Sequence, residues 1–580
     1  MKNKTITRAK DMIKPYLKSI IIVSLLSLFV SACEIIKPYL IKVVIDNYLG
    51  KGIFETAFFN ITKIGIIYIG FVLAGNIINF IATTATNIIG ENVIFDMRNK
   101  LFRYTQYANI PFHDKTSAGK LFVRIINDVE DISTLFKDVI STIIRDVILI
   151  LIIMGIMIVF SYKLSFMSFI VIPFIIIFTV VLTNILKKIY DKAKKIRTNL
   201  NTFLAESIYG AKVIKIFNIQ KEKKIECETY TKQFRDERAK EGVIQAILPG
   251  IMTILENIGI AIILITCTNH LFGINIEVGL IYIFITYIRQ LFEPITRIVE
   301  NIEIVEEASV SINKIYDILD RKEYLENLEI GKELKKVKGK IEFKNVWFSY
   351  DEKNWVLKNV SFTINPGESI ALVGKTGSGK TTITNLINRF YDIQKGEILI
   401  DGINVKDINI RDLRSHIGVI LQDPFIFAES IRDNIKLNKS IMEEDIENAI
   451  ELSSANEFIN SLPNGIEEVA KERGNSYSAG EKQLLAFARI FAHNLDIFVL
   501  DEATANIDTY TESLIQKSID ILSKEKTAIF IAHRLSTIVN VDKIIVLSNG
   551  EIVEEGNHNE LVQTGGYYSK LYNAYYESLG

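Results

Sequence analysis

The chain of 580 residues is too long to fold around one hydrophobic core, so we expect at least two domains. Its 67 basic and 68 acidic residues give a net charge of −1, which disfavours a nucleic-acid-binding protein. Hydrophobic residues make up 49% of the chain and are concentrated in its first half, which indicates membrane spans there. The three cysteines have neither the spacing of a metal site nor the number of a disulfide framework.

Three apolar stretches of the first half clearly predict membrane spans. Residues 64–90 and 164–186 carry no charge over 27 and 23 residues, and roughly 20 residues cross a hydrocarbon core of about 30 Å. The run from Ser19 to Cys33 follows a basic N-terminus, as a signal peptide would. It continues past residue 33 without a convincing cleavage site, so we interpret it as a retained first span.

Three further stretches, residues 139–160, 243–268 and 278–298, predict spans that contain charged side chains. Charges inside a bilayer are unfavourable and usually face a partner helix or a water-filled cavity. Arg145 could equally lie near the end of a helix longer than the membrane, from which its guanidinium reaches water. Glu256 is better placed for a cavity, where it would suit an amphipathic or cationic compound.

Lysine and arginine are concentrated in the two long segments that follow the second and fourth spans, whereas the opposite loops are nearly free of them. The positive-inside rule therefore places these segments and both termini in the cytoplasm. Both segments have helical periodicity, with turns at residues 111–121 and 206–210. Short helices that dock on another domain are expected at these two turns.

The composition changes after residue 319. We expect a transmembrane domain of six spans at residues 1–320, a charged linker at 321–340 and a second domain at 341–580. From residue 341 onward, strand-like runs alternate with helical patterns, which predicts an α/β domain with a mostly parallel sheet. The expected fold is multidomain, with an all-α transmembrane domain of six long helices followed by this α/β domain.

A glycine-rich stretch lies between a predicted buried strand, residues 369–373, and a predicted helix that continues through Thr382. It consists of Gly374, Lys375, Thr376, Gly377, Ser378, Gly379, Lys380 and Thr381. In a loop of this spacing, backbone N–H groups and the helix dipole face phosphates, Lys380 reaches the terminal phosphates and Thr381 can hold Mg²⁺. The stretch predicts a P-loop ATPase domain that binds and hydrolyses a nucleoside triphosphate.

Two later strands end in side chains suited to that hydrolysis. The buried strand 497–500 ends in Asp501 and Glu502, and α/β proteins place ligand chemistry at the carboxyl ends of strands. Asp501 suits a Mg²⁺ ligand and Glu502 suits the base that activates the attacking water. His533 follows strand 527–532, and we favour a hydrogen bond to a γ-phosphate over an ordinary surface histidine.

These motifs, in this order, resemble those of an ABC exporter of the type with six membrane spans fused to one nucleotide-binding domain. The resemblance implies that ATP and Mg²⁺ are the cofactors, and that residues 374–381 and 497–502 are the Walker A loop and Walker B strand. It also implies that Tyr350 stacks on adenine, that Gln422 contacts the metal and the water, and that Asp508 belongs to the D-loop. The two expected short helices match the helices that couple the domains.

The signature segment (residues 477–481) departs from the Leu-Ser-Gly-Gly-Gln of that family. In the family, this segment of one subunit closes over ATP held by the other, and here Ser478 and Gly480 keep the hydroxyl and one glycine that face the phosphates. Ala479 adds a methyl group, and Glu481 places a negative charge near a polyanion. The residues expected to hydrolyse ATP are intact, whereas the signature is weakened. This combination favours one subunit of a heterodimer over a homodimer in which the changes at Ala479 and Glu481 are tolerated.

We therefore expect ATP-driven export of a hydrophobic or amphipathic substrate (drug, lipid or peptide) across the cytoplasmic membrane by two half-transporters. The alternatives are a homodimeric exporter, such as a lipid flippase, and a nucleotide-gated channel or sensor. A soluble ABC ATPase that acts on nucleic acid is disfavoured by the uncharged stretch 64–90.

Overall fold

The computed structural model describes residues 2–49, 58–268, 277–321, 328–334, 336–437, 439–501, 507–531 and 538–577. It divides into two compact units. The first contains residues 1–106 and 117–322, and the second contains residues 107–116 and 323–580. The short segment 107–116 thus belongs to the second unit, although it lies within the range expected for the transmembrane domain.

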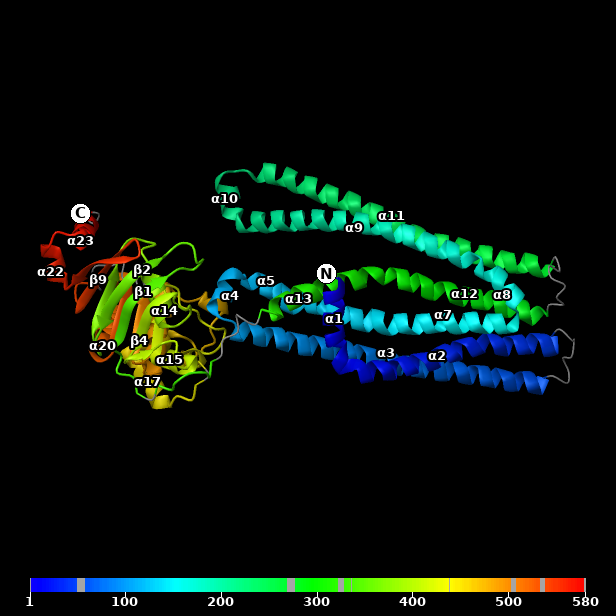
Figure 1. The fold of residues 1–580 in the computed structure, drawn as a ribbon, viewed down its shortest axis with the longest axis horizontal. Coiled ribbons are helices and arrows are strands. Elements are labelled where there is room, and N and C mark those ends of the chain that lie inside the picture. Colours follow the sequence, from blue (N-terminus) through cyan, green and yellow to red (C-terminus); the bar gives the residue numbers. More distant parts are fainter. Residues whose placement is uncertain are drawn as a thin grey trace. The chain divides into compact units, whose positions relative to one another are not determined.

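The first unit is a bundle of long helices (Figure 1). Among the described residues, six helical segments are long and apolar enough to cross a membrane: Thr7–Leu49, Phe59–Tyr107, Ala118–Phe160, Tyr162–Tyr209, Gln220–Cys267 and Val278–Ile298. Each of these segments contains, coincides with or, to within one residue, covers one predicted span, so the prediction of six spans is confirmed. Five of them are more than 40 residues long, about twice what the hydrocarbon core requires.

The elements of this unit are α1 (Lys2–Ile13), η1 (Lys14–Tyr16), α2 (Leu17–Val44), η2 (Ile45–Leu49), α3 (Phe58–Tyr107), α5 (Ala118–Val123), η3 (Arg124–Asp128), α6 (Val129–Thr134), η4 (Leu135–Ile140), α7 (Ser141–Phe160), α8 (Tyr162–Phe169), α9 (Val171–Tyr209), α10 (Ala211–Ile216), α11 (Gln220–Thr268), α12 (Val278–Glu300) and α13 (Ile302–Leu319).

Buried side chains of α2, α7, α8, α9, α11 and α12 form the core of the bundle, which includes Phe284 and Tyr287. The Tyr287 hydroxyl donates to the Ile35 carbonyl at 2.9 Å and satisfies its only polar group inside this apolar core. Large apolar side chains also point outward, and Phe80 and Phe95 are 72% and 66% exposed. Such an outer surface suits contact with lipid.

Charged side chains within the predicted spans pair with one another. Glu256 of α11 lies 3.2 Å from Arg289 of α12, and buried Asp146 of α7 accepts two hydrogen bonds from Arg297 of α12. The Glu256 side chain, which the sequence placed facing a cavity, is therefore neutralised by a partner helix. Pairing of this kind lowers the free-energy cost of charge inside a membrane protein.

The second unit contains two sheets (Figure 1). The smaller sheet is antiparallel in the order β2-β1-β4-β5, and the larger has the order β10-β9-β3-β8-β7-β6 with only the β10–β9 pair antiparallel. An all-α bundle followed by an α/β domain confirms the expected fold class. The strands are β1 (Ile341–Phe348), β2 (Leu357–Ile364), β3 (Ser369–Val373), β4 (Lys395–Ile400), β5 (Ile403–Asn404), β6 (Ile417–Ile420), β7 (Ile497–Asp501), β8 (Thr527–Ile531), β9 (Lys543–Ser548) and β10 (Glu551–Gly556).

Two hydrophobic clusters fill this unit, on either side of the larger sheet, because the central strands β3 and β8 are buried on both faces. The helices are α4 (Ile110–Lys115), α14 (Lys380–Ile387), α15 (Ile410–His416), α16 (Ile431–Lys436), α17 (Glu443–Leu452), α18 (Asn456–Ser461), η6 (Gly465–Glu467), η7 (Glu472–Gly474), α19 (Ala479–Ala492), α20 (Thr509–Glu525), α22 (His558–Gln563) and α23 (Tyr567–Glu577).

Part of the expected linker is attached to the second unit. The Lys332 N–H donates to the Asp407 carbonyl at 2.7 Å, and the Leu334 N–H donates to the Asp412 carboxylate at 3.1 Å. Residues 322–327 and 335 lie outside the described residues. Lys332 and Leu334 of the linker are therefore bound to α15 and the turn before it.

Candidate nucleotide site

The loop of residues 374–381 joins the buried strand β3 to helix α14, and two of its glycines are required by the backbone. Gly379 has φ +109° at the N-cap of α14, and a Cβ there would lie 2.6 Å from a Leu357 methyl carbon. A Cβ on Gly374 would lie 2.3 Å from the Leu547 carbonyl oxygen. Side chains at these positions would clash, so the glycines let the loop curl tightly around its own backbone N–H groups.

Two polar side chains of this loop are buried. Lys380 is 6% exposed, and its Nζ donates to the carbonyls of Gly374 and Lys375 at 2.6 and 3.2 Å. The Ser378 Oγ is buried and has no hydrogen-bond partner in the described part of the chain. A buried ammonium group and an unsatisfied hydroxyl are costly unless an anion meets them. The loop therefore fits the phosphates of a nucleotide.

Tyr350 lies beside the first turn of α14. Its hydroxyl donates to Thr382 Oγ1 at 3.2 Å, and its ring packs edge-on against those of Phe348 and Tyr391 at 4.7 and 4.9 Å. The residue is 44% exposed. The structure thus brings Tyr350 to the loop, with ring surface still available to stack on a purine.

The sheet register brings the predicted hydrolytic residues to one edge. Leu372 of β3 pairs with Ile531 of β8, and Ile531 pairs with Asp501 of β7, so the three strands end together. The loop begins after β3, and Asp501 ends β7 half-buried. Glu502 and His533, which follow β7 and β8 in the sequence, lie outside the described residues.

The other predicted metal ligands are exposed side chains near that edge. Thr381 lies in the first turn of α14, and Gln422 follows β6, the neighbour of β7. No group of three or more His, Cys, Asp or Glu side chains that could hold a metal ion occurs among the residues the structure describes. Mg²⁺ usually binds one or two carboxylates together with substrate phosphates and water. One carboxylate, Asp501, beside a phosphate loop fits that requirement.

The signature segment starts helix α19 with a capping box. Ser478 is the N-cap, its Oγ accepts from the Glu481 N–H at 3.2 Å, and the Glu481 carboxylate accepts from the Ser478 N–H at 2.6 Å. Ala479 is exposed on the surface of this chain. Glu481 is therefore held by its own helix and places its charge at the helix N-terminus. The Ser-x-x-Glu spacing of Ser478 and Glu481 is the local pattern of a capping box, so this contact could be predicted from the sequence.

Gly480 and Asp508 both contact Thr511 in the first turn of α20. A Cβ on Gly480 would lie 2.3 Å from a Thr511 methyl carbon, and the Asp508 carboxylate caps α20 by accepting from the Thr511 N–H at 2.9 Å. This backbone hydrogen bond lowers the pKa of Asp508 below its ordinary value. The signature and the D-loop are thus packed together, and only glycine fits between them.

Two residues of α19 were missed by the sequence reasoning. Gln483 is buried, and its Nε2 donates to the carbonyls of Leu421 and Gln422 at 3.0 Å each. Arg489 donates to the Phe425 carbonyl and to Asn434, and burial lowers its pKa to about 10. Both side chains hold the segment that carries Gln422 against the signature helix. Only their contacts, made more than 50 residues away in the chain, reveal this role.

A third missed residue is Tyr391. Its hydroxyl donates to the Asp114 carboxylate of α4, and its ring contacts that of Tyr350. Burial, followed by the hydrogen bond to Asp114, raises the pKa of Tyr391. Helix α4, one of the two short helices expected from the sequence, is therefore linked by one side chain to the predicted adenine contact.

Comparison with known proteins identifies the class. The family described as the ABC transporter transmembrane region matches residues 20–295, and the family described as ABC transporter matches residues 357–505. The chain is 38% identical over 491 residues to YheH of Bacillus subtilis, a protein provisionally named for multidrug resistance, with 83% and 72% of the two chains covered. It is 31% identical over 573 residues to the ATP-dependent lipid A-core flippase of Haemophilus influenzae, with 98% and 97% covered.

The fold agrees with these relatives. A bacterial Atm1-family ABC exporter with ATP bound has the same fold, with a TM-score of 0.78 at 22% identity over 97% and 98% of the two chains. The site and the bundle together define an ATP-driven membrane transporter. The chain belongs to the ABC exporters, as a half-transporter that fuses one transmembrane region to one ABC ATPase and functions in a dimer.

Proposed function

We propose that this half-transporter pairs with a different half-transporter to export an amphipathic compound, drug or lipid, across the cytoplasmic membrane. In this proposal the termini and the ATPase lie in the cytoplasm, and one of the two ATP sites hydrolyses slowly. The observation that carries the proposal is the combination of a phosphate loop fitted to ATP with a signature helix capped by its own carboxylate. The relatives support the export of drug-like or lipid-like compounds through their names alone.

The Glu481 carboxylate supports asymmetry for an electrostatic reason. The N-terminus of a helix carries partial positive charge and N–H groups that attract anions. Here the Ser478 N–H donates to Glu481, so the chain's own carboxylate already occupies this position at 2.6 Å. A partner's ATP would meet a negative charge where the family presents a neutral glutamine.

The chain's own phosphate loop has no such defect, and the residues at the sheet edge have separate tasks in the proposed mechanism. Lys380 would neutralise charge on the terminal phosphates, and Tyr350 would stack on the adenine ring. Bound Mg²⁺, held by Thr381, Gln422 and Asp501, would supply further charge neutralisation. Glu502 would orient and deprotonate the attacking water, and His533 would donate to the γ-phosphate.

Native mass spectrometry of the tagged chain, purified from its own membranes, tests the pairing. A dimer that contains one copy of this chain and one different half-transporter is the expected result. A dimer of two identical chains would instead establish the homodimeric exporter.

ATP hydrolysis by the purified complex tests the mechanism. Glu502→Gln should abolish turnover while ATP binding persists, because this substitution removes the base and leaves the phosphate loop intact. Turnover near the wild-type rate would show that Glu502 does not have this role. Uptake of a dye into inverted vesicles distinguishes a pump from a channel, because only a pump accumulates the dye against its gradient.

A further inference from the structure

Helix α9 carries an exposed stripe of side chains that changes from apolar to basic along the helix. The helix extends from Val171 to Tyr209, whereas the uncharged run that predicts its span ends at residue 186. The residues of the stripe are separated by three, four or seven positions, so they lie on one face of the helix. These residues, here called the α9 stripe, are Phe174, Ile177, Val181, Lys188, Lys192 and Lys195.

The apolar half of the α9 stripe is not covered by the rest of the chain. Phe174, Ile177 and Val181 are 58%, 61% and 51% exposed. All three lie within the predicted span, where the surroundings are hydrocarbon. This half of the stripe therefore offers an apolar surface to acyl chains.

The basic half of the α9 stripe begins where the span ends. At 1.5 Å per residue, Lys188, Lys192 and Lys195 follow residue 186 by roughly 3, 9 and 14 Å. The Cα–Cβ bonds of a helix are tilted toward its N-terminus, which in α9 is the membrane end. The long lysine side chains thus lean back toward the lipid head groups, which extend roughly 5–8 Å beyond the hydrocarbon.

The basic half keeps a positive surplus after its acidic neighbours are counted. Residues 187–197 contain six basic side chains and one acidic side chain, Asp191. Carboxylates of neighbouring helices that contact this segment are those of Glu237, Glu306 and Glu307. Six basic side chains against these four acidic ones leave a surplus of two positive charges. Glu237 is also shared by Lys192 and Lys240, at 2.7 and 2.8 Å, so it fully neutralises neither lysine.

The α9 stripe can be covered either by lipid or by the second chain of the dimer. Lysine is depleted in protein–protein interfaces, and the cores of such interfaces avoid charge. The negative surface of the cytoplasmic leaflet, in contrast, attracts basic segments just outside a span. An apolar half at hydrocarbon depth, followed by lysines at head-group depth, matches one kind of molecule from end to end. That molecule is an anionic phospholipid.

We propose that the α9 stripe binds an anionic phospholipid of the cytoplasmic leaflet. The acyl chains lie along the apolar half, and the phosphate pairs with Lys188 and Lys192. Lys195 lies farther from the head groups and adds attraction over a distance within the Debye length. The bound lipid belongs to the membrane around the transporter and is not the exported compound. This inference rests on the orientation proposed above, in which α9 leaves the membrane on the cytoplasmic side.

Lipid titration of the purified full-length complex, followed by native mass spectrometry, tests the proposal. The probes are phosphatidylglycerol, which is anionic, and phosphatidylcholine with the same acyl chains, which has no net charge. Lys188→Gln should weaken phosphatidylglycerol binding about fivefold, because one lysine at an anionic lipid surface contributes roughly that factor. Lys188→Arg keeps the charge and should leave this affinity within twofold. Both variants should bind phosphatidylcholine like the wild type, which excludes misfolding.

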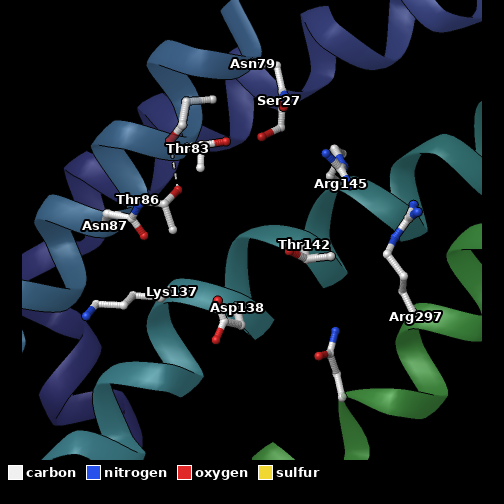
Figure 2. Close-up of a pocket in the computed structure, with 12 residues that line it drawn as sticks. Ser27, Asn79, Thr83, Thr86, Asn87, Lys137, Asp138, Thr142, Arg145 and Arg297 are labelled. Atoms are coloured by element: carbon white, nitrogen blue, oxygen red, sulfur yellow. Dashed lines mark hydrogen bonds between the residues drawn. The ribbon is translucent and has the colours of Figure 1, made fainter. Parts of the chain in front are cut away.

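Lys137→Gln is the matched control for charge. Like Lys188, Lys137 lies two residues outside a predicted span, but it lines a cavity inside the bundle (Figure 2) and pairs with Glu91 at 2.7 Å. Its loss should leave phosphatidylglycerol binding within twofold. Ile177→Ala tests the apolar half and should weaken both lipids alike, about threefold, because it removes a contact surface that both share.

The proposal is wrong if Lys188→Gln weakens both lipids equally, if it matches Lys137→Gln, or if it has no effect. If the second chain covers the stripe instead, Lys188→Gln should reduce the dimer signal in the same spectra and leave lipid affinity unchanged. The titration uses neither nucleotide nor an exported compound, so its result does not depend on the substrate or on the identity of the partner chain. The two proposals can therefore fail separately.

Discussion

The Arg297 guanidinium of α12 donates to both carboxylate oxygens of Asp146 of α7, at 3.0 and 2.8 Å, and the Asp146 side chain is fully buried. This pair joins two spans that are separated by 151 residues in the chain. A buried ion pair of this geometry adds little stability compared with an apolar contact, but breaking it leaves an uncompensated charge.

We expect Asp146→Asn to destabilise the bundle by about 3 kcal/mol, because Arg297 and Arg145 would lose the carboxylate they share. Thermal unfolding, monitored as the loss of the helical far-ultraviolet circular dichroism signal, measures this change. Glu293→Gln is the control, since Glu293 also pairs with Arg297 but its side chain is 75% exposed. Equal thermal shifts in the two variants would contradict the importance assigned to Asp146.

Glu481→Gln should raise ATP hydrolysis by the assembled dimer about threefold to tenfold. Glutamine keeps the capping box but removes the negative charge from the N-terminus of α19, so a phosphate is no longer repelled. Steady-state ATPase activity of the reconstituted dimer is the measurement. Glu512→Gln, a substitution of the same charge in the first turn of α20, is the control and should leave the rate unchanged.

Gly379→Ala should abolish ATP binding, because the added methyl group would clash with Leu357 and the backbone has φ +109°. Gly367→Ala is a matched control, since Gly367 also has a positive φ of 73° but has open space around its Cα. Both variants carry backbone strain of roughly 1 kcal/mol. Fluorescent-nucleotide titration should therefore show loss of binding only at position 379, and equal loss at both positions would disprove the steric argument.

Asp508 should make the stability of the second unit depend on pH in the acid range. Its pKa is lowered in the folded state, so its carboxylate stabilises α20 above the unfolded pKa of about 3.9. This stabilisation is lost as the pH falls through the lower folded pKa. Asn is also a good N-cap but does not titrate.

The comparison of wild type with Asp508→Asn therefore measures this contribution. Below about pH 4 the wild-type melting temperature should fall more steeply than that of the variant. Both tryptophans, Trp347 and Trp355, lie in the second unit, so tryptophan fluorescence follows its unfolding selectively. Parallel pH profiles for the two proteins would show that the Asp508 carboxylate does not contribute.

The sequence alone determined the features that depend on neighbours along the chain. Six apolar stretches predicted six spans, because the length of a span is a property of a continuous segment. The loop of residues 374–381 was recognisable because phosphate binding there uses consecutive backbone N–H groups. The capping box of Ser478 and Glu481 could also be predicted from their local spacing.

Only the tertiary structure decided the contacts between distant segments. The partner of Asp146, the approach of Tyr391 to Asp114 and the hydrogen bonds of Gln483 depend on how each helix is rotated about its axis. A hydropathy pattern does not specify that rotation in a helix that is apolar on nearly all sides. The same reason explains why residues 64–90 read as a plain apolar span. Asn79, Thr83 and Asn87 of this span line a cavity that residues of α7 and α12 complete, and only the tertiary structure shows this.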